Sequence, residues 1–372
     1  ICYIFVGAAA VFFLLAAVHV HHLLTFNTTT VNVYSSNKAK SKHMYPLNSV
    51  QPRIFTAPHN LSALCIPFTH LMGHDRNSPS EDGLLLVRIP KTGSSTVGGV
   101  AARIAYKMAY KYYRNDSIVC KSRLTHAWSA HSLKRNKSFA NRNRNSSFLW
   151  TLLRNPADRA QSGYYFFHAT QHHDIAISTI QKHPNHLLKW TASSNYKHYT
   201  PAAIHETIKQ FNFMGLLERL DESLVILQLL LGLQPHDVLY LTGAKQSASF
   251  DISNQCRQLP ENIKTPTLQE YFNSEQWFQD NHGDYMLYNA VNSSLDLTIE
   301  RYIGTSKFDA ALKEFQRVQR LANEHCAYKS PCIANGVYRP KNETGAKCYA
   351  EDWGCGYECL DALFPAKLGK HV

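Results

Sequence analysis

The sequence predicts an α/β protein, with a central, mostly parallel sheet flanked by helices and a cysteine-rich C-terminal extension. The prediction rests on a pattern that occurs twice: a short apolar run leads through a basic residue and a turn into a helical segment. The apolar runs are residues 84–87 (LLLV) and 148–153 (FLWTLL), and alternating strands and helices are typical of parallel sheets. The chain has 372 residues, 44% of them hydrophobic, which is enough for one large core or two modest ones.

The first unit continues into a Lys-Thr-Gly-Ser-Ser-Thr turn at residues 91–96. A helical pattern follows, with apolar side chains at three- and four-residue spacing, namely Val97, Val100, Ala101, Ile104 and Met108. The first N–H groups of such a helix lack internal partners and its dipole adds partial positive charge, so a phosphate or sulfate binds there readily. Lys91 would add a full charge, and the Ser and Thr hydroxyls would add donors. The alternative is an ordinary strand-to-helix turn with a surface lysine.

The turn is not a Walker A loop, because Lys91 precedes Gly93 and no glycine lies just upstream. In the second unit, Arg154 ends the strand, Asn155 is a predicted helix cap, and Pro156 suits the first helical position. A guanidinium at the carboxyl end of a parallel strand is well placed to bind a phosphate. The alternative is that Arg154 pairs with a carboxylate of the cap, that of Asp158.

The two turns resemble the donor-binding motifs of one enzyme family. The order Pro-Lys-Thr-Gly-Ser-Ser-Thr at 90–96 resembles the 5′-phosphosulfate loop of sulfotransferases, and Arg-Asn-Pro-x-x-Arg-x-x-Ser at 154–162 resembles their 3′-phosphate motif. The chain is most similar to the Golgi carbohydrate enzymes of this P-loop-like superfamily, the heparan sulfate 2-O- and galactose 3-O-sulfotransferases. The aromatic run at 164–167 is similar to the 2-O-type enzymes, and the resemblance covers about residues 84–320.

The resemblance implies the transfer of a sulfuryl group from 3′-phosphoadenosine 5′-phosphosulfate (PAPS) to a glycan hydroxyl, without a metal. Lys91 would both bind the donor and stabilise charge on the leaving phosphate, and Ser162 would meet the same phosphate as Arg154. The implied donor-binding residues are Lys91, Thr92, Gly93, Ser94, Ser95, Thr96, Arg154 and Ser162.

The acceptor hydroxyl also needs a proton acceptor, either a neutral histidine or a glutamate. The 2-O-type enzymes place a histidine ahead of the 3′-phosphate strand, and His126 and His131 occupy that interval here. We prefer His126 and keep His131 as the reserve, although the closely spaced histidine pair of the family is absent. The alternative for either residue is a surface or packing role.

The formal net charge of +12 favours an anionic partner. Nucleic acid is not expected, because no zinc-finger, RNP-type or heptad signature accompanies the charge. The expected acceptor is a glycan, with acidic polysaccharides among the candidates. Two other function classes stay open: a nucleotide-dependent kinase with a variant phosphate loop, and a catalytically inactive, membrane-anchored glycan-binding protein.

The N-terminus suggests a single-pass, type II Golgi membrane protein with a lumenal catalytic domain. Residues 1–18 carry no charge and would span about 27 Å as a helix, against about 30 Å of hydrocarbon; a cleaved signal peptide is the alternative. We expect an anchor at 1–24, a stem at 25–82, a sulfotransferase domain at 83–322 and an extension at 323–372. Seven Asn-x-Ser/Thr sequons favour a lumenal location: Asn27, Asn60, Asn115, Asn136, Asn145, Asn292 and Asn342.

The C-terminal extension holds five of the nine cysteines. We expect disulfides there rather than a zinc cluster, because no two-residue Cys-x-x-Cys knuckle is present and a lumen is oxidising. The connectivity is open, and the odd cysteine could pair with Cys256 or Cys120. The five are Cys326, Cys332, Cys348, Cys355 and Cys359.

The remaining segments carry weaker signals. We expect a strand at 211–217, a helix at 224–231 capped by Asp221 and closed by Gly232, and a short strand at 237–241. Helical periodicity covers 268–321. The His- and Asn-rich stretch 168–200 has no clear period, and we expect acceptor contacts from it.

Overall fold

The structure is a computed structural model, and it places the predicted anchor outside the residues that can be described. The described residues all belong to one compact unit, Tyr45–Val372. Among these residues, none of the helices combines the length and the apolar composition that a membrane span requires. The described residues are 45–59, 66–67, 83–94, 96–101, 103–104, 118–119, 122–125, 142–168, 173–192, 199–241, 248–250, 256–258, 265–326, 332–333, 337–338 and 357–364.

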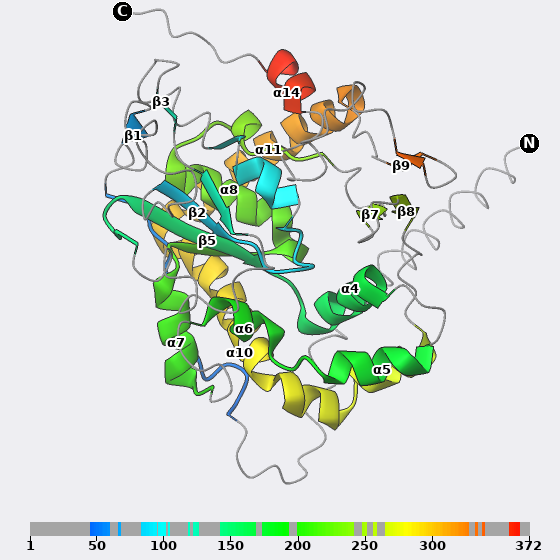
Figure 1. Ribbon diagram of the computed structural model, residues 1–372. Coiled ribbons are helices and arrows are strands. Elements are labelled where there is room, and N and C mark those ends of the chain that lie inside the picture. The colour runs from blue at the N-terminus through cyan, green and yellow to red at the C-terminus, as the bar shows by residue number, and fades with distance from the viewer. Residues whose placement is uncertain are drawn as a thin grey trace, which may run out of the picture. The chain divides into compact units, whose positions relative to one another are not determined.

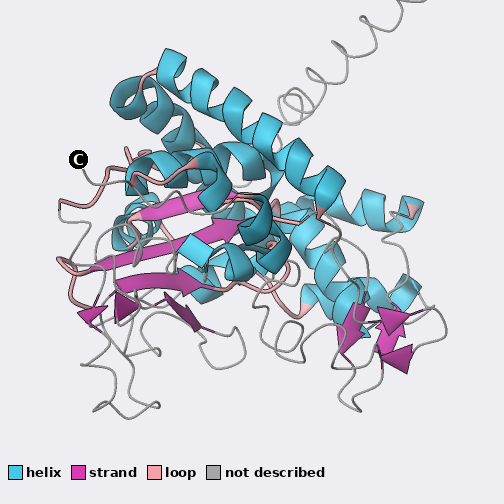
Figure 2. Ribbon diagram, turned by 90° about the horizontal axis from the view of Figure 1, so that it is seen from above, coloured by secondary structure: helices cyan, strands magenta, loops and turns pink. Residues whose placement is uncertain are grey.

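A four-stranded parallel sheet forms the centre of this unit, as Figures 1 and 2 show. The strand order is β4-β2-β5-β6, and each neighbouring pair is parallel. All side chains of β2, β5 and β6 are buried, because helices cover both faces of a parallel sheet. The predicted fold class is therefore confirmed. The strands are β2 (Gly83–Val87), β4 (Ser122–Thr125), β5 (Ser147–Leu153) and β6 (Phe213–Leu216).

Helices and short antiparallel strand pairs surround the sheet. The α-helices are α4 (Pro156–His168), α5 (His173–Gln181), α6 (His186–Thr191), α7 (Pro201–Gln210), α8 (Leu220–Leu231), α9 (Pro266–Phe272), α10 (Glu275–Thr298), α11 (Thr305–His325) and α14 (Tyr357–Leu363). Two 3₁₀ turns, η3 (Leu217–Arg219) and η4 (Pro235–Asp237), and a π-helical turn, η6 (Ile299–Ile303), extend or link them. The short pairs are β1 (Ile66–Pro67) with β3 (Ile118–Val119), β7 (Ala248–Phe250) with β8 (Cys256–Gln258), and β9 (Cys332–Ile333) with β10 (Val337–Tyr338).

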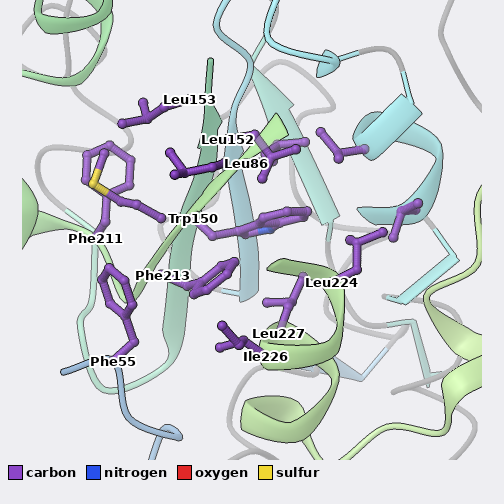
Figure 3. Close-up of a cluster of buried hydrophobic side chains, with 14 of the residues drawn as sticks. Phe55, Leu86, Trp150, Leu152, Leu153, Phe211, Phe213, Leu224, Ile226 and Leu227 are labelled. Carbon is purple, nitrogen blue, oxygen red and sulfur yellow. The ribbon is translucent and has the colours of Figure 1, made fainter. Parts of the chain in front are cut away.

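The larger core, which we call the sheet core, packs α8 and α10 against the sheet. Figure 3 shows Trp150 of β5 and Phe213 of β6 facing Leu224 and Leu227 of α8. Phe55, from the segment ahead of the sheet, packs against Phe213 in a T-shaped pair with the ring centroids 5.4 Å apart. Burial of these large apolar side chains is the main contribution to the stability of such a core.

A second core lies between α4, α5, α9 and α10, and we call it the helical core. The two tyrosines of the aromatic run, Tyr164 and Tyr165, are buried in it. Its other members lie on all four helices and are largely aromatic: Ala160, Ile180, Leu268, Tyr271, Phe272 and Trp277. In Figure 1, α4 begins beyond the end of β5 and lies beside α5. The start of α4 therefore lies between the two cores.

Two local predictions fail, and one stretch without a clear period in the sequence forms helices. Helix α8 begins at Leu220 and ends, as predicted, at left-handed Gly232, so Asp221 lies inside its first turn and is not the cap. Residues 237–241 form no strand: the Gln319 amide accepts a hydrogen bond from Tyr240 N and donates one to Tyr240 O. The stretch 168–200, in which the sequence showed no clear period, contains α5 and α6.

Two further segments bear on the sequence predictions. Strand β4, which the sequence did not predict, lies at the edge of the sheet beside β2. The helix after residue 93 buries Val97, Val100, Ala101 and Ile104, as the periodicity predicted; Met108 lies outside the described residues.

A disulfide joins Cys326, at the end of α11, to Cys359 of α14. The expectation of disulfides in the extension is confirmed at this pair, whose identity the sequence had left open. Cys348, Cys355 and Cys120 lie outside the described residues.

Candidate active site

The two strand–turn–helix units start side by side, at the carboxyl ends of neighbouring strands. Val87 of β2 is in register with Thr151 of β5, and the Thr151 hydroxyl donates to the Val87 carbonyl at 2.8 Å. The turn after β2 and the turn after β5 therefore leave the sheet at the same edge. In open α/β proteins this edge is where ligands bind.

The turn after β2 depends on two left-handed residues. Lys91 has φ 68° and Gly93 has φ 76°, a region that is unfavourable for a residue with a side chain. The Gly93 carbonyl accepts from Val97 N at 3.1 Å and so begins the helix. The Thr92 hydroxyl is buried and donates to the Ile89 carbonyl at 3.0 Å. It closes the turn, so of Thr92 only the backbone N–H is left for the predicted donor-binding role.

Lys91 is the most perturbed cation of the two turns. Its ammonium lies 3.7 Å from the centroid of the Phe166 ring, and no carboxylate among the described residues pairs with it. Burial, and then the nearby Arg154 guanidinium, lower the pKa of Lys91 to about 8. A bound anion would supply the missing counter-charge.

The turn after β5 is built as the sequence predicted. The Asn155 side chain accepts from Ala157 N at 3.0 Å, the Asn155 carbonyl accepts from Arg159 N, and Pro156 is the first residue of α4. Arg154 does not pair with Asp158: its guanidinium donates to the Lys91 carbonyl at 3.3 Å. The two turns are thus in direct contact through their basic residues.

Both turns rest on η3, which follows β6. An ideal Cβ on Gly93 would lie 2.7 Å from Leu217 Cδ1, so the loop packs closely against that side chain. Asn155 N donates to Glu218 Oε1 at 2.8 Å, and the other Glu218 oxygen accepts from the Tyr288 hydroxyl at 3.2 Å. Nothing in the sequence signals these contacts, because Leu217 and Glu218 look like ordinary residues of a strand-to-helix connection.

Some of the predicted site residues lie in the described part of the chain and others do not. Ser162 is a buried residue of α4, two turns after Arg154, and Ser94 and Thr96 are partly exposed at the start of the helix. Ser95, His126 and His131 lie outside the described residues. The structure thus brings together Lys91, Gly93, Arg154 and the start of α4, and it leaves the proton acceptor as a prediction.

Arg159, the second arginine of the motif at 154–162, also lies near this site, although the sequence analysis gave it no separate role. Its guanidinium Nη1 lies 3.7 Å from the position of an ideal Cβ on Gly163, and Lys91 Cγ lies 3.9 Å from the same point. Burial lowers the pKa of Arg159 to about 10, with Asp284 opposing and Arg154 adding to that effect. No group of metal-ligating residues that could hold an ion is present among the described residues.

These features define an α/β protein with an anion-binding site at the carboxyl edge of a parallel sheet, since its cations lack carboxylate partners in the described part of the chain. A family model described as the sulfotransferase family matches residues 78–274. That range contains both turns, and the chain belongs to this family. No curated protein and no solved structure matches the sequence of this chain.

Proposed function

We propose that this sulfotransferase uses PAPS as its donor and a glycan hydroxyl as its acceptor. The family implies transfer of a sulfuryl group from a sulfonate donor. The observation that supports PAPS is the pair Lys91 and Arg154, which lie at the ends of adjacent strands and are joined by the Arg154–Lys91 carbonyl contact. PAPS carries an anionic group at each end of its ribose, and two neighbouring cationic turns suit such a molecule.

The residues of the two turns would have different functions in the reaction. When bound, PAPS supplies the sulfuryl group and a phosphate that leaves as the new bond to the acceptor oxygen forms. The Lys91 ammonium and the N–H groups at the helix start stabilise the negative charge that develops on that phosphate. Arg154 and Ser162 hold the other end of the donor. Glu218 and Leu217 keep the two turns at a fixed separation.

His126 takes the acceptor proton in this proposal, with His131 as the reserve. An unperturbed imidazole has a pKa near 6.5 and is largely neutral at about pH 7. His126→Ala should bind the donor normally and lose turnover by about 10²–10⁴-fold, the usual contribution of a general base. If His131→Ala is inactive and His126→Ala is active, His131 is the general base. If both variants are active, the base is another residue.

The direct test of the proposed function is transfer of label from sulfur-labelled PAPS by the full chain to a panel of desulfated polysaccharides and glycolipids. Lys91→Ala is the inactive control. Label on at least one glycan, absent with Lys91→Ala, supports the proposal. Binding of the donor without transfer to any glycan would favour the inactive glycan-binding alternative, and preferential binding of ATP would favour a kinase.

We propose a Golgi lumenal location for the site, with the N-terminal segment as its anchor. The sequons offer a test, because only lumenal asparagines receive N-glycans. Asn145 is exposed at the turn before β5, whereas Asn292 lies within α10 and its side-chain oxygen accepts from Arg219 at 2.9 Å. We expect a glycan at Asn145 and none at Asn292; an unmodified Asn145 in protein purified from its own cells would count against the location.

A further inference from the structure

Helix α14 of the C-terminal extension is packed into the described fold. The disulfide between Cys326 and Cys359 links it to the end of α11, beside which it lies in Figure 1. Leu360 is fully buried in the sheet core, and Leu363 and Phe364 pack against the same core. Buried apolar side chains and a covalent link both favour this position of α14.

Phe364, directly after α14, contacts the η4 turn. Its ring stacks on the His236 ring, with the ring centroids 5.8 Å apart and the ring planes inclined by 13°. Aromatic pairs of this kind contribute more than their buried area alone. The η4 turn also packs against α11, and its Asp237 carboxylate accepts from Gln234 N at 2.9 Å. The η4 turn is therefore supported by both α11 and α14.

The backbone of η4 contacts the helix that begins in the Lys91 turn. The His236 carbonyl accepts a hydrogen bond from the Arg103 guanidinium, and only 4% of Arg103 is exposed. This helix starts where Val97 N donates to the Gly93 carbonyl, and Arg103 lies less than two turns after Val97. A path of contacts therefore runs from α14 through His236 to the Lys91 turn.

The Arg154 turn is held by different residues. Its backbone is fixed by the Asn155 cap and by Glu218 of η3. A change at α14 should therefore act on one of the two cationic turns more than on the other.

We propose that Phe364 and His236 are positioning residues for the Lys91 turn, and that the Cys326–Cys359 disulfide keeps α14 where they can act. This inference rests on the proposed function, in which the Lys91 turn binds the 5′ anionic group of the donor. The C-terminal extension then contributes to the affinity for that group without touching it. A path of packed side chains transmits an effect only if its members bias the same equilibrium, and binding measurements can show whether they do.

The test is calorimetric titration of the full chain with adenosine 5′-monophosphate and, separately, with adenosine 3′-monophosphate. Phe364→Leu removes the stacked ring and keeps an apolar side chain. It should weaken binding of the 5′-monophosphate about twofold to tenfold, the range that the loss of an aromatic pair implies. Binding of the 3′-monophosphate should stay the same, because the Arg154 turn is held by other residues. Phe364→Tyr keeps the ring and should bind both ligands like the wild type.

The disulfide is tested by combining Cys326→Ser with Cys359→Ser. This variant should show the same selective loss for the 5′-monophosphate. Adding Phe364→Leu to it should cause little further loss, because both changes act through α14. An unchanged affinity without the disulfide would overturn the role of the disulfide. Thr200→Ala is the matched control, since it removes a cap from α7 and should lower stability while leaving both affinities unchanged.

The outcomes also separate this inference from the proposed function. A wild type that binds neither monophosphate nor adenosine 3′,5′-bisphosphate contradicts the proposed function itself. A wild type that binds them, with the 5′-monophosphate affinity unchanged in Phe364→Leu, overturns only the positioning role. Equal losses for the two monophosphates would show that α14 supports the fold in general and would also overturn it. If the variant without the disulfide does not fold, Phe364→Leu and Phe364→Tyr decide the question alone.

Discussion

The two cationic turns look alike in outline but are held in different ways. The Arg154 turn is fixed mainly by its own sequence, since Asn155 caps α4 and Pro156 opens it, and one further bond runs from Asn155 N to Glu218 of η3. The Lys91 turn contains two left-handed residues and rests on Leu217, more than a hundred residues away. The first arrangement is what a local cap provides, and the second is a strained backbone that the surrounding structure holds in place.

The difference suggests a division between binding and chemistry. A turn that is stable by itself can provide a permanent binding contact. A turn held by residues far away in the sequence can keep a cation buried and without a carboxylate partner. At such a position its charge has the largest effect on a negative charge that develops in the reaction. Substitutions in the two turns should therefore affect different quantities.

The largest effect should come from Lys91→Ala. We expect turnover to fall about 10²–10³-fold, the typical loss when one electrostatic stabiliser of a transition state is removed. Affinity for adenosine 3′,5′-bisphosphate should fall much less. Single-turnover transfer from labelled donor measures the first quantity and calorimetry the second. Equal losses in both would show that Lys91 only binds.

The same lysine should make binding dependent on pH. Because its pKa in the free protein is lowered to about 8, Lys91 is charged below that pH and loses its proton as the pH rises through it. An anion binds the charged form better, so affinity for the bisphosphate should be highest below pH 8 and fall between pH 7 and 9. The fall should be absent in Lys91→Ala; if it persists there, another group is responsible.

Arg154→Ala should act mainly on binding. Affinity for the bisphosphate should fall about 10- to 150-fold, because a hydrogen bond to a charged group contributes about 1.5–3 kcal/mol. Turnover at saturating donor should change less than in Lys91→Ala. An unchanged dissociation constant in calorimetry would contradict the assignment of Arg154 to the donor.

Gly93→Ala should damage the Lys91 turn through the backbone. The left-handed conformation costs about 1–2 kcal/mol for a residue with a Cβ, and the new Cβ would displace Leu217. Urea unfolding measures the loss. Gly304→Ala is the control, since Gly304 also has positive φ but has open space around its Cβ position. Both variants should be less stable, and only Gly93→Ala should also weaken donor binding.

The smallest effect should come from Asn155→Ala. Loss of this cap should reduce the free energy of unfolding by about 0.5–2 kcal/mol, with donor affinity close to that of the wild type. Thr200→Ala removes a comparable cap from α7, where the hydroxyl accepts from Ala203 N, and should give a similar loss. A large drop in affinity in Asn155→Ala would mean that the Arg154 turn is not stable independently of its cap.

The sequence predicted the strands and helix ends that are determined by residues close together in the chain. The apolar runs gave β2 and β5, Asn155 and Pro156 gave the start of α4, and Gly232 gave the end of α8. The basic residues at the strand ends gave Lys91 and Arg154. Their contact with each other follows from the parallel pairing of β2 with β5; the fold class implied a parallel sheet but not that these two strands are neighbours.

The parts that could not be predicted depend on contacts across long stretches of chain. Helix α6 starts where Asp284 accepts from Leu187 N, 97 residues away in sequence, and nothing in the stretch 168–200 signals that partner. Tyr240 lies beside Gln319 instead of in a strand for the same reason. The burial of Arg159 was also hidden, because an arginine in a helix looks like a solvated residue until its surroundings are known.

The three residues of η3 each hold a different neighbour. Leu217 supports the Lys91 turn, Glu218 binds the start of α4, and Arg219 reaches α10 through Asp296 and Asn292. The distance between the two cationic turns is therefore constrained by one short segment that belongs to neither of them, in addition to their own contact and the pairing of β2 with β5. A donor whose two anionic groups are joined by a rigid nucleoside needs that distance to be constant. Sequence change in η3 would alter the length of molecule that the site accepts, while every residue that touches the donor stayed the same.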